Sequence, residues 1–256
     1  MRFHKIYALS LRHIYLICSS FPRIIDLIYW PTVQIFLWGF ISKFFTLNST
    51  YYSNTVGIIL TAAILYDFLF RASISYNMMF LEEIWSRNFT NLFIAPIKIS
   101  EIIASLTLTA IFRTLIGLVP ATILAIPLFG VSVFKLGIPL LFLLLSLYIF
   151  GITLGVLVTS GLLRFGPAFE SVAWASLFFL APLGCIYYPI EILPHSLQLI
   201  AKALPLVHIF EEMRNILLNN SVSWFQIIKS ISISIMYFVF GVIVFYVSYF
   251  GAKVRG

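Results

Sequence analysis

Charged residues are scarce in this chain, since Asp, Glu, Lys and Arg make up only 10% of its 256 residues. A soluble globular domain has roughly a quarter. Hydrophobic residues account for 61%, and the mean hydropathy is +1.05. These values exclude a water-soluble globular protein. We interpret the chain as an integral membrane protein with room for about six helical spans of ~20 residues each.

Other absences narrow the function. Only Cys18 and Cys185 occur, which is too few for a disulfide framework or a zinc knuckle. No G-x-x-x-x-G-K-[ST] sequence is present, so we expect this chain to bind no nucleotide itself. The net charge of +7 comes from basic residues scattered singly, as on the flanks of membrane spans, so no nucleic-acid partner is expected. Residues 1–20 contain Arg12 and His13 and lack an A-x-A-like site, so we expect no cleaved signal peptide.

The apolar runs predict one all-α transmembrane domain over residues 1–256 with six spans. The predicted spans are 24–45, 55–81, 102–129, 136–163, 171–188 and 227–250. The first two fall within 24–81 and the next three within 102–188. Residues 1–23 combine basic and apolar side chains, which favours a helix in the membrane interface over an ordinary basic flank of the first span. Gly151 and Gly155 form a GxxxG pair, which either packs two helices closely or arises by chance.

The positions of Lys and Arg predict the orientation. With the N-terminus inside, nine of them fall on cytoplasmic segments and five on outer ones. Because cytoplasmic loops carry the excess of positive charge, both termini are expected in the cytoplasm.

The polar stretch 82–100 interrupts the apolar pattern between the second and third spans. Trp85, Phe89, Leu92 and Phe93 recur at helical spacing, and Pro96 ends the pattern. We predict a short cytoplasmic helix with an aromatic and aliphatic stripe that inserts into a partner.

This stretch resembles the coupling loop of ABC type-2 permeases, the membrane subunits of one class of ABC exporter. The resemblance rests on Glu83, Arg87, Leu92, Pro96 and Glu101. In that family the loop docks on a separate ATPase subunit. The resemblance therefore implies a coupling role for a set of residues within 82–100: Glu83, Trp85, Arg87, Phe89, Leu92, Phe93 and Pro96.

A second block, within 189–226 and the residues just before it, resembles the segment between the last two spans of the same family. Its order is Tyr188, Pro189, Pro194, Pro205 and Arg214. The resemblance implies re-entrant helices that cap the outer end of a translocation path. Apolar residues at helical spacing between Pro194 and Pro205 agree with a short amphipathic helix, and an extracellular loop lying on the membrane is the alternative.

The resemblance implies the permease subunit of an ABC exporter in a bacterial plasma (inner) membrane. Its expected partners are a second copy of itself, an ABC ATP-binding subunit and membrane lipids. The substrate would be a lipid, a glycan or a drug-like molecule. ATP and Mg would be bound by the ATP-binding subunit, and this chain would hold no cofactor, metal or catalytic residue.

Two other functions remain open. Glu82, Glu83 and Arg87 match the EExxxR pattern of intramembrane CAAX-type proteases, but the four histidines lie outside the predicted spans. An ATP-independent transporter is the third reading. His208, Glu211 and Glu212 share a helix face, which indicates either a metal site or a solvated helix end.

Three ionisable residues fall deep in predicted spans, where charges are costly unless paired or facing water. Asp67 and Arg71 are spaced to pair along one helix. The pair either has a structural role or lines a path or subunit interface. Arg113 either lines such a path, snorkels or bonds the backbone.

Overall fold

The computed structural model describes residues 3–48, 55–88, 91 and 94–255. This part of the chain is helical and contains no strand. The helices are α1 (Phe3–Cys18), α2 (Phe21–Asn48), α3 (Thr55–Trp85), α5 (Ile99–Phe129), α6 (Pro139–Phe165), α7 (Glu170–Leu183), α8 (His195–Ala203), α9 (Pro205–Asn219) and α10 (Trp224–Arg255). Short 3₁₀ turns, η2 (Val133–Leu136), η3 (Pro167–Phe169) and η4 (Ile190–Ile192), lie between them.

Within the described residues, five helices are long and apolar enough to cross a membrane. They are Phe21–Phe44, Gly57–Trp85, Ile99–Phe129, Pro139–Phe165 and Trp224–Lys253. These helices coincide with five of the six predicted spans. The chain therefore has the architecture of a multi-pass helical membrane protein.

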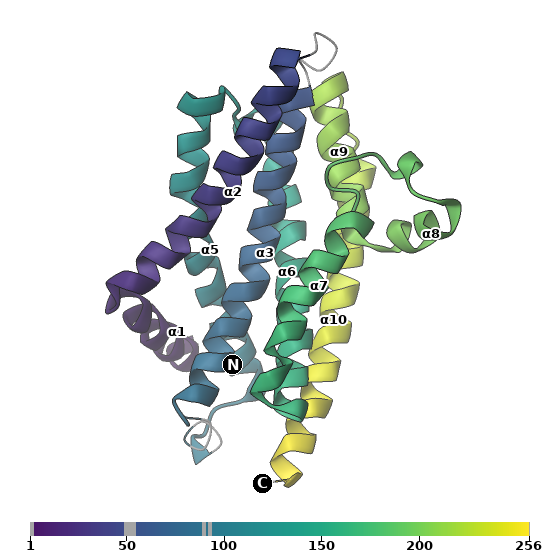
Figure 1. The fold of residues 1–256 in the computed structure, drawn as a ribbon. Coiled ribbons are helices and arrows are strands. Elements are labelled where there is room, and N and C mark those ends of the chain that lie inside the picture. The colour runs from purple at the N-terminus through teal and green to yellow at the C-terminus, as the bar shows by residue number, and fades with distance from the viewer. Residues whose placement is uncertain (1–2, 49–54, 89–90, 92–93, 256) are drawn as a thin grey trace.

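The predicted fifth span, 171–188, is wrong in extent. α7 has 14 residues and is therefore about 21 Å long, whereas a typical hydrocarbon core is about 30 Å thick. The helix ends because Pro182 and Gly184 lie at its end and Cys185 has a φ of 52°. α9 then packs against α3 and α6, the same two helices that α7 contacts. The space expected for one long helix therefore holds two shorter helices, and α8 projects from the side between them (Figure 1).

The bundle is built around α3 and α6, which pack closely on each other. α10 runs along α6, while α2 and α5 pack together and against α3. A Cβ at Gly151 would lie 2.8 Å from the Leu69 carbonyl oxygen, and one at Gly155 would lie 2.9 Å from the Cβ of Tyr76. These distances are too short for a side chain, so the glycine pair lets α6 approach α3 closely.

α1 lies across one end of the bundle, beside the lower ends of α3 and α5 (Figure 1). The helical conformation is interrupted at Ser19 and Ser20, which separate α1 from α2. The marks for the two chain ends lie toward this same end of the bundle (Figure 1). A separate N-terminal helix is therefore present, and its position in a membrane interface stays a prediction.

The stretch 82–100 differs from its prediction. α3 continues through Glu82, Glu83 and Trp85, so these residues form its last turn and do not begin a separate helix. A turn follows at 86–88, where Arg87 has a φ of 52° that ends the helix. Trp85 is therefore the last residue of α3. Phe89, Leu92 and Phe93 lie outside the described residues.

Candidate functional site

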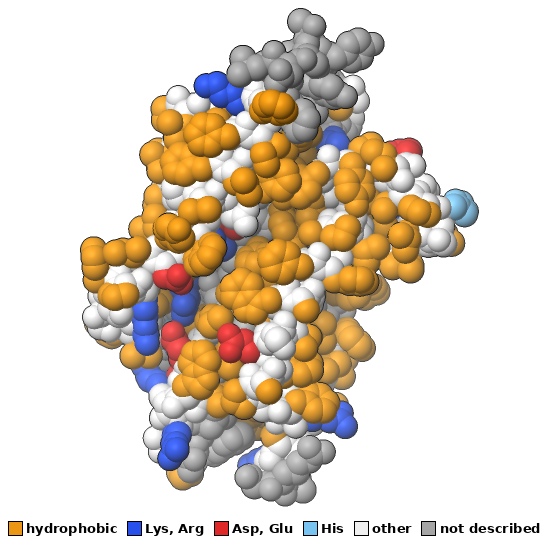
Figure 2. Space-filling model, viewed as in Figure 1, with side chains coloured by type: hydrophobic (Ala, Val, Ile, Leu, Met, Phe, Trp, Pro, Cys, Tyr) orange, Lys and Arg blue, Asp and Glu red, His pale blue; other side chains and the backbone are white. Residues whose placement is uncertain are grey.

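Charged side chains gather at the end of the bundle where α1 meets α3 and α5. Figure 2 shows a largely apolar surface, with basic and acidic side chains concentrated at the lower left. We call the cluster of Arg12, His13, Arg23, Glu82, Glu83 and Arg113 the charged junction. These residues come from α1, α2, α3 and α5.

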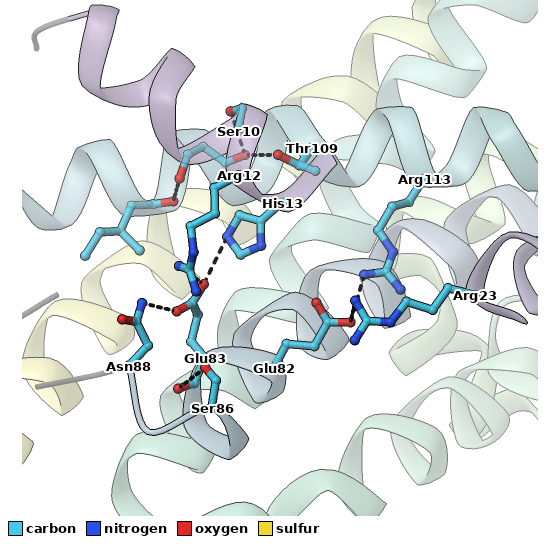
Figure 3. Close-up of polar contacts among 12 residues, drawn as sticks. Ser10, Arg12, His13, Arg23, Glu82, Glu83, Ser86, Asn88, Thr109 and Arg113 are labelled. Carbon is cyan, nitrogen blue, oxygen red and sulfur yellow. Dashed lines mark hydrogen bonds and ion pairs between the residues drawn. The ribbon is translucent and has the colours of Figure 1, made fainter. Parts of the chain in front are cut away.

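Glu83 is the most enclosed acid of the charged junction, with 5% of its side chain exposed. Arg12 Nη1 of α1 donates to its Oε1 at 2.5 Å, and Asn88 Nδ2 of the following turn donates to its Oε2 at 2.6 Å. His13 Nε2 lies 3.5 Å from Oε1 (Figure 3). Because a buried carboxylate must be paired and hydrogen-bonded, these contacts fix the last turn of α3 against α1.

Glu82, one residue earlier, faces a different set of partners. Its Oε1 lies 3.7 Å from Arg113 Nη1 of α5 and 3.9 Å from Arg23 Nη1 at the start of α2 (Figure 3). Arg113 is buried and sits in the middle of α5. Arg113 is therefore paired with an acid of a neighbouring helix, and a role in lining a path stays a prediction.

α1 also contacts residues near the start of α5. Lys5 Nζ donates to the carbonyl oxygen of Pro96. Ser10 Oγ donates to the Ser105 carbonyl of α5 at 3.4 Å. One face of α1, including Ser10 and His13, is buried, while Tyr7 and other apolar side chains on the opposite face are exposed. α1 therefore contacts both ends of the connection between α3 and α5.

His13 lies on α1, which is not one of the five membrane-spanning candidates. Burial lowers its pKa below the ordinary value of 6.5. The negative charge of Glu83 opposes this effect, and the positive charge of Arg12 adds to it. The neutral imidazole is therefore the form that the folded junction favours.

The remaining residues predicted to couple to a partner lie at the surface. Trp85 is 57% exposed, and Arg87 and Pro96 are also exposed. Ser86 Oγ donates to the Glu83 carbonyl at 3.3 Å and shapes the turn. The described part of the stretch thus presents Trp85, Arg87 and Pro96 outward, while Glu83 is directed into the bundle.

The second predicted block contains a buried arginine, Arg214, on α9. Its side chain contacts the residues that follow the end of α7. Arg214 Nη1 donates to the carbonyl oxygens of Cys185 at 2.9 Å and Ile186 at 3.2 Å. Its Nη2 donates to Glu211 Oε1 at 2.7 Å, and this carboxylate accepts the Ile190 N–H at 3.0 Å. We call this set of contacts the arginine staple, because it ties α9 to residues 185–190.

The other predicted residues of this block lie at element boundaries. Tyr188 Oη donates to the Pro182 carbonyl at 2.6 Å. Pro189 precedes η4, Pro194 precedes α8, and Pro205 is the first residue of α9. A short helix, α8, lies between Pro194 and Pro205, and its re-entrant position stays a prediction.

His208, Glu211 and Glu212 do not converge on a common point. His208 contacts Gln226 Oε1 and the Lys202 carbonyl, both at 3.1 Å. Glu212 accepts the Ser223 N–H at 2.6 Å. Over the described residues, no group of three or more His, Cys, Asp or Glu side chains could hold a metal ion.

Asp67 and Arg71 form the expected pair within α3. Arg71 Nε donates to Asp67 Oδ2 at 2.9 Å. Nearby, Tyr66 Oη donates to the Leu177 carbonyl of α7 at 2.6 Å. The pair is therefore satisfied within one helix, and a role in lining a path stays a prediction.

Sequence reasoning missed Arg12, His13 and Arg23 as partners of the two glutamates. The sequence showed basic residues along an amphipathic N-terminal segment and two adjacent acids at the end of a span. The opposite charges of these two segments indicate that they could pair. The pairing nevertheless depends on how α1 folds back, which no local spacing specifies.

A scan against models of known protein families gave no match, and a search of curated proteins found no match. The five long apolar helices of the described residues give the chain the architecture of a helical, multi-pass membrane protein.

Proposed function

We propose that the chain is the permease subunit of an ABC exporter and works with a separate ATP-binding subunit. The observation that supports this most directly is the double attachment of α1 to the connection between α3 and α5. Arg12 holds Glu83 before the connection, and Lys5 bonds Pro96 after it. The resemblance of residues 82–100 to a coupling loop supplies the kind of partner.

The proposed mechanism is mechanical. The ATP-binding subunit presses on residues 85–96 when it closes on ATP. Because Glu82 and Glu83 connect the end of α3 to α1, α2 and α5, the displacement reaches four helices together. α1 moves along the membrane interface and α2 tilts, which opens a route for a lipid, glycan or drug-like substrate.

The proposed complex contains two copies of this chain. α2 exposes large aromatic side chains, including Trp30 at 54% and Phe40 at 61%. Such a surface suits contact with a second copy or with lipid. The resemblance favours a second copy that contributes the other half of the route. The proposed location is a bacterial plasma membrane, with both termini in the cytoplasm.

The first test is purification of the tagged chain in detergent from its native host, followed by an ATPase assay. We expect an ATP-binding subunit in stoichiometric amount. Phe89→Ala, Leu92→Ala and Arg87→Glu should reduce its recovery or uncouple hydrolysis from transport. Phe134→Ala and Lys135→Glu, in η2, serve as matched controls and should have no effect. A stable chain without an ATP-binding partner would contradict the proposal.

One observation favours the protease alternative, namely the 3.5 Å approach of His13 to Glu83. A general base needs an available carboxylate, whereas Glu83 is already held by Arg12 and Asn88. The geometry therefore suits a structural link better than hydrolysis. If the purified chain cleaved a peptide and the variant Glu83→Gln did not, the protease function would be favoured over the structural link.

A further inference from the structure

An apolar groove runs along the outside of the bundle between α5 and α10. α6 forms its floor with Leu145 and Tyr148, and Tyr148 Oη donates to the Thr107 carbonyl at the edge. The groove has a volume of about 700 Å³, within the range of roughly 300–1,000 Å³ for small-molecule sites. No residue of the charged junction and none of the predicted coupling residues lines it.

Helix packing explains why the groove exists. α5 lines it with the small residues Ser100, Ala104 and Thr107 and with the larger Ile103, Leu108 and Ile111. α10 supplies Phe238 and Tyr246 on the facing wall. Since α10 is held along α6 and α5 packs against α2 and α3, neither helix fills the space between them.

The position of the groove in the fold identifies the kind of molecule that covers it. Both walls belong to helices long and apolar enough to span a membrane. Its lining on α5, residues 100–111, extends for about 16 Å along the helix axis. An apolar channel of this length beside a bilayer is filled by hydrocarbon, because water there would lose its hydrogen bonds.

Positive charge marks the end of the groove near the charged junction. Lys98 directly precedes α5, two residues before Ser100. Lys253 follows Tyr246 by seven residues, which places it on the same face of α10 about 10 Å further along the axis. Both lysines are exposed, and neither has an ion-pair partner among the described residues. Glu101, the neighbouring acid on α5, is buried and accepts the Lys98 N–H.

We propose that this groove binds an acyl chain of an anionic phospholipid, with the phosphate group between Lys98 and Lys253. The hydrocarbon lies along Ala104 and Phe238, and the headgroup stays in the membrane interface. Basic residues at the cytoplasmic end of a gap between spans are a suitable site for anionic headgroups. This inference depends on the membrane architecture and not on the proposed export.

Photocrosslinking in vesicles tests the proposal. The protein is reconstituted in phosphatidylcholine vesicles containing a trace of phosphatidylglycerol or phosphatidylcholine with a diazirine on one acyl chain. Adducts are then mapped by peptide mass spectrometry. We expect adducts concentrated in residues 100–111 and 238–246. The phosphatidylglycerol probe should label them about tenfold more strongly than the phosphatidylcholine probe, since each lysine near the surface favours anionic lipid.

Two variants separate the headgroup from the acyl chain. The double variant Lys98→Gln, Lys253→Gln should bring the two probes to equal labelling, while Lys135→Gln, in η2, should leave the preference unchanged. Ala104→Phe should remove the adducts by filling the groove. Its control is Val119→Phe, which adds the same side chain at an exposed position of α5 outside the groove. Melting temperature and elution volume confirm that each variant is folded.

Several results would overturn the proposal. One is equal labelling of the groove and of the exposed face of α2, which would indicate ordinary contact with bulk lipid. Another is labelling that survives Ala104→Phe. A third is a phosphatidylglycerol preference that is absent or unaffected by the loss of both lysines, which would exclude the headgroup site. Since ATPase coupling is not measured, failure here leaves the proposed export untouched.

Discussion

The charged junction and the arginine staple both hold glutamates with arginines, but they are built differently. In the charged junction, Arg12 and Glu83 are 71 positions apart and pair through their side chains. In the arginine staple, Arg214 contacts Glu211 only three positions away and carbonyl oxygens 28 and 29 positions away. The charged junction connects helices, whereas the staple supports one local change of chain direction.

This difference follows from what each region must satisfy. The break after α7 leaves carbonyl groups without helical donors, and buried carbonyls must find partners. Arg214 supplies two such bonds, at Cys185 and Ile186. In the charged junction the backbone is already satisfied within helices, so its ion pairs only set how α1 sits on α3 and α5. We therefore expect the staple to govern stability and the junction to govern coupling between helices.

The largest expected effect is that of Arg214→Gln. It removes a buried guanidinium from two carbonyls and from Glu211, and it should destabilise the protein by about 3 kcal/mol. Unfolding in detergent, followed by loss of helical circular dichroism, measures the change. Arg164→Gln, at an exposed site next to Phe165, is the control and should change stability by less than about 0.5 kcal/mol. Equal effects in the two variants would contradict the assignment of the staple.

A smaller effect is expected from a double-mutant cycle on Arg12→Gln and Glu83→Gln. The coupling energy should be about 1 kcal/mol, because one partner is enclosed while the other is partly exposed. The pair Arg23 and Glu82, separated by 3.9 Å, should couple by less than about 0.5 kcal/mol. Equal coupling energies for the two pairs would contradict the expectation that the shorter and more buried pair is the stronger one.

The smallest effect is a dependence on pH. Burial lowers the pKa of His13 in the folded protein, so between that value and 6.5 the unfolded chain binds more protons. Stability is therefore constant above about pH 7 and falls as the pH drops below about 6.5, by about 1 kcal/mol or less by pH 5.5. Unfolding measured across this range should show a flatter profile for His13→Asn.

His208 must be separated from this effect, since burial lowers its pKa in the same direction. The variant His208→Asn provides the comparison, and the two losses should add, because the residues lie in different regions. If the pH dependence of stability were unchanged in His13→Asn, protonation of His13 would not cause it, and His208 would be its source.

Local pattern predicted much of the fold. Five spans coincide with apolar runs, and the prolines at 194 and 205 correctly bracket α8. The pairing of Asp67 with Arg71 followed from their spacing along one helix. These features depend on residues close in sequence, so a pattern with a period of 3.6 residues carries the information.

The errors occur where distant residues decide the outcome. The apolar run 171–188 looked long enough for a span, yet α7 ends at Leu183 and α9 occupies the remaining space against α3 and α6. The stretch after Glu82 looked like the start of a new helix, yet its first residues complete α3. In both cases packing against other helices outweighs the local pattern.

The sequence by itself determined that the chain enters a membrane as a set of helices, because scarce charge and long apolar runs leave no other way to satisfy the backbone in lipid. Only the tertiary structure decided which charges meet. Several basic residues of the chain could have paired with Glu83. Arg12 and His13 do so because α1 folds back across the end of the bundle. The cost of a buried charge requires that it have partners, and the packing of the helices decides which residues they are.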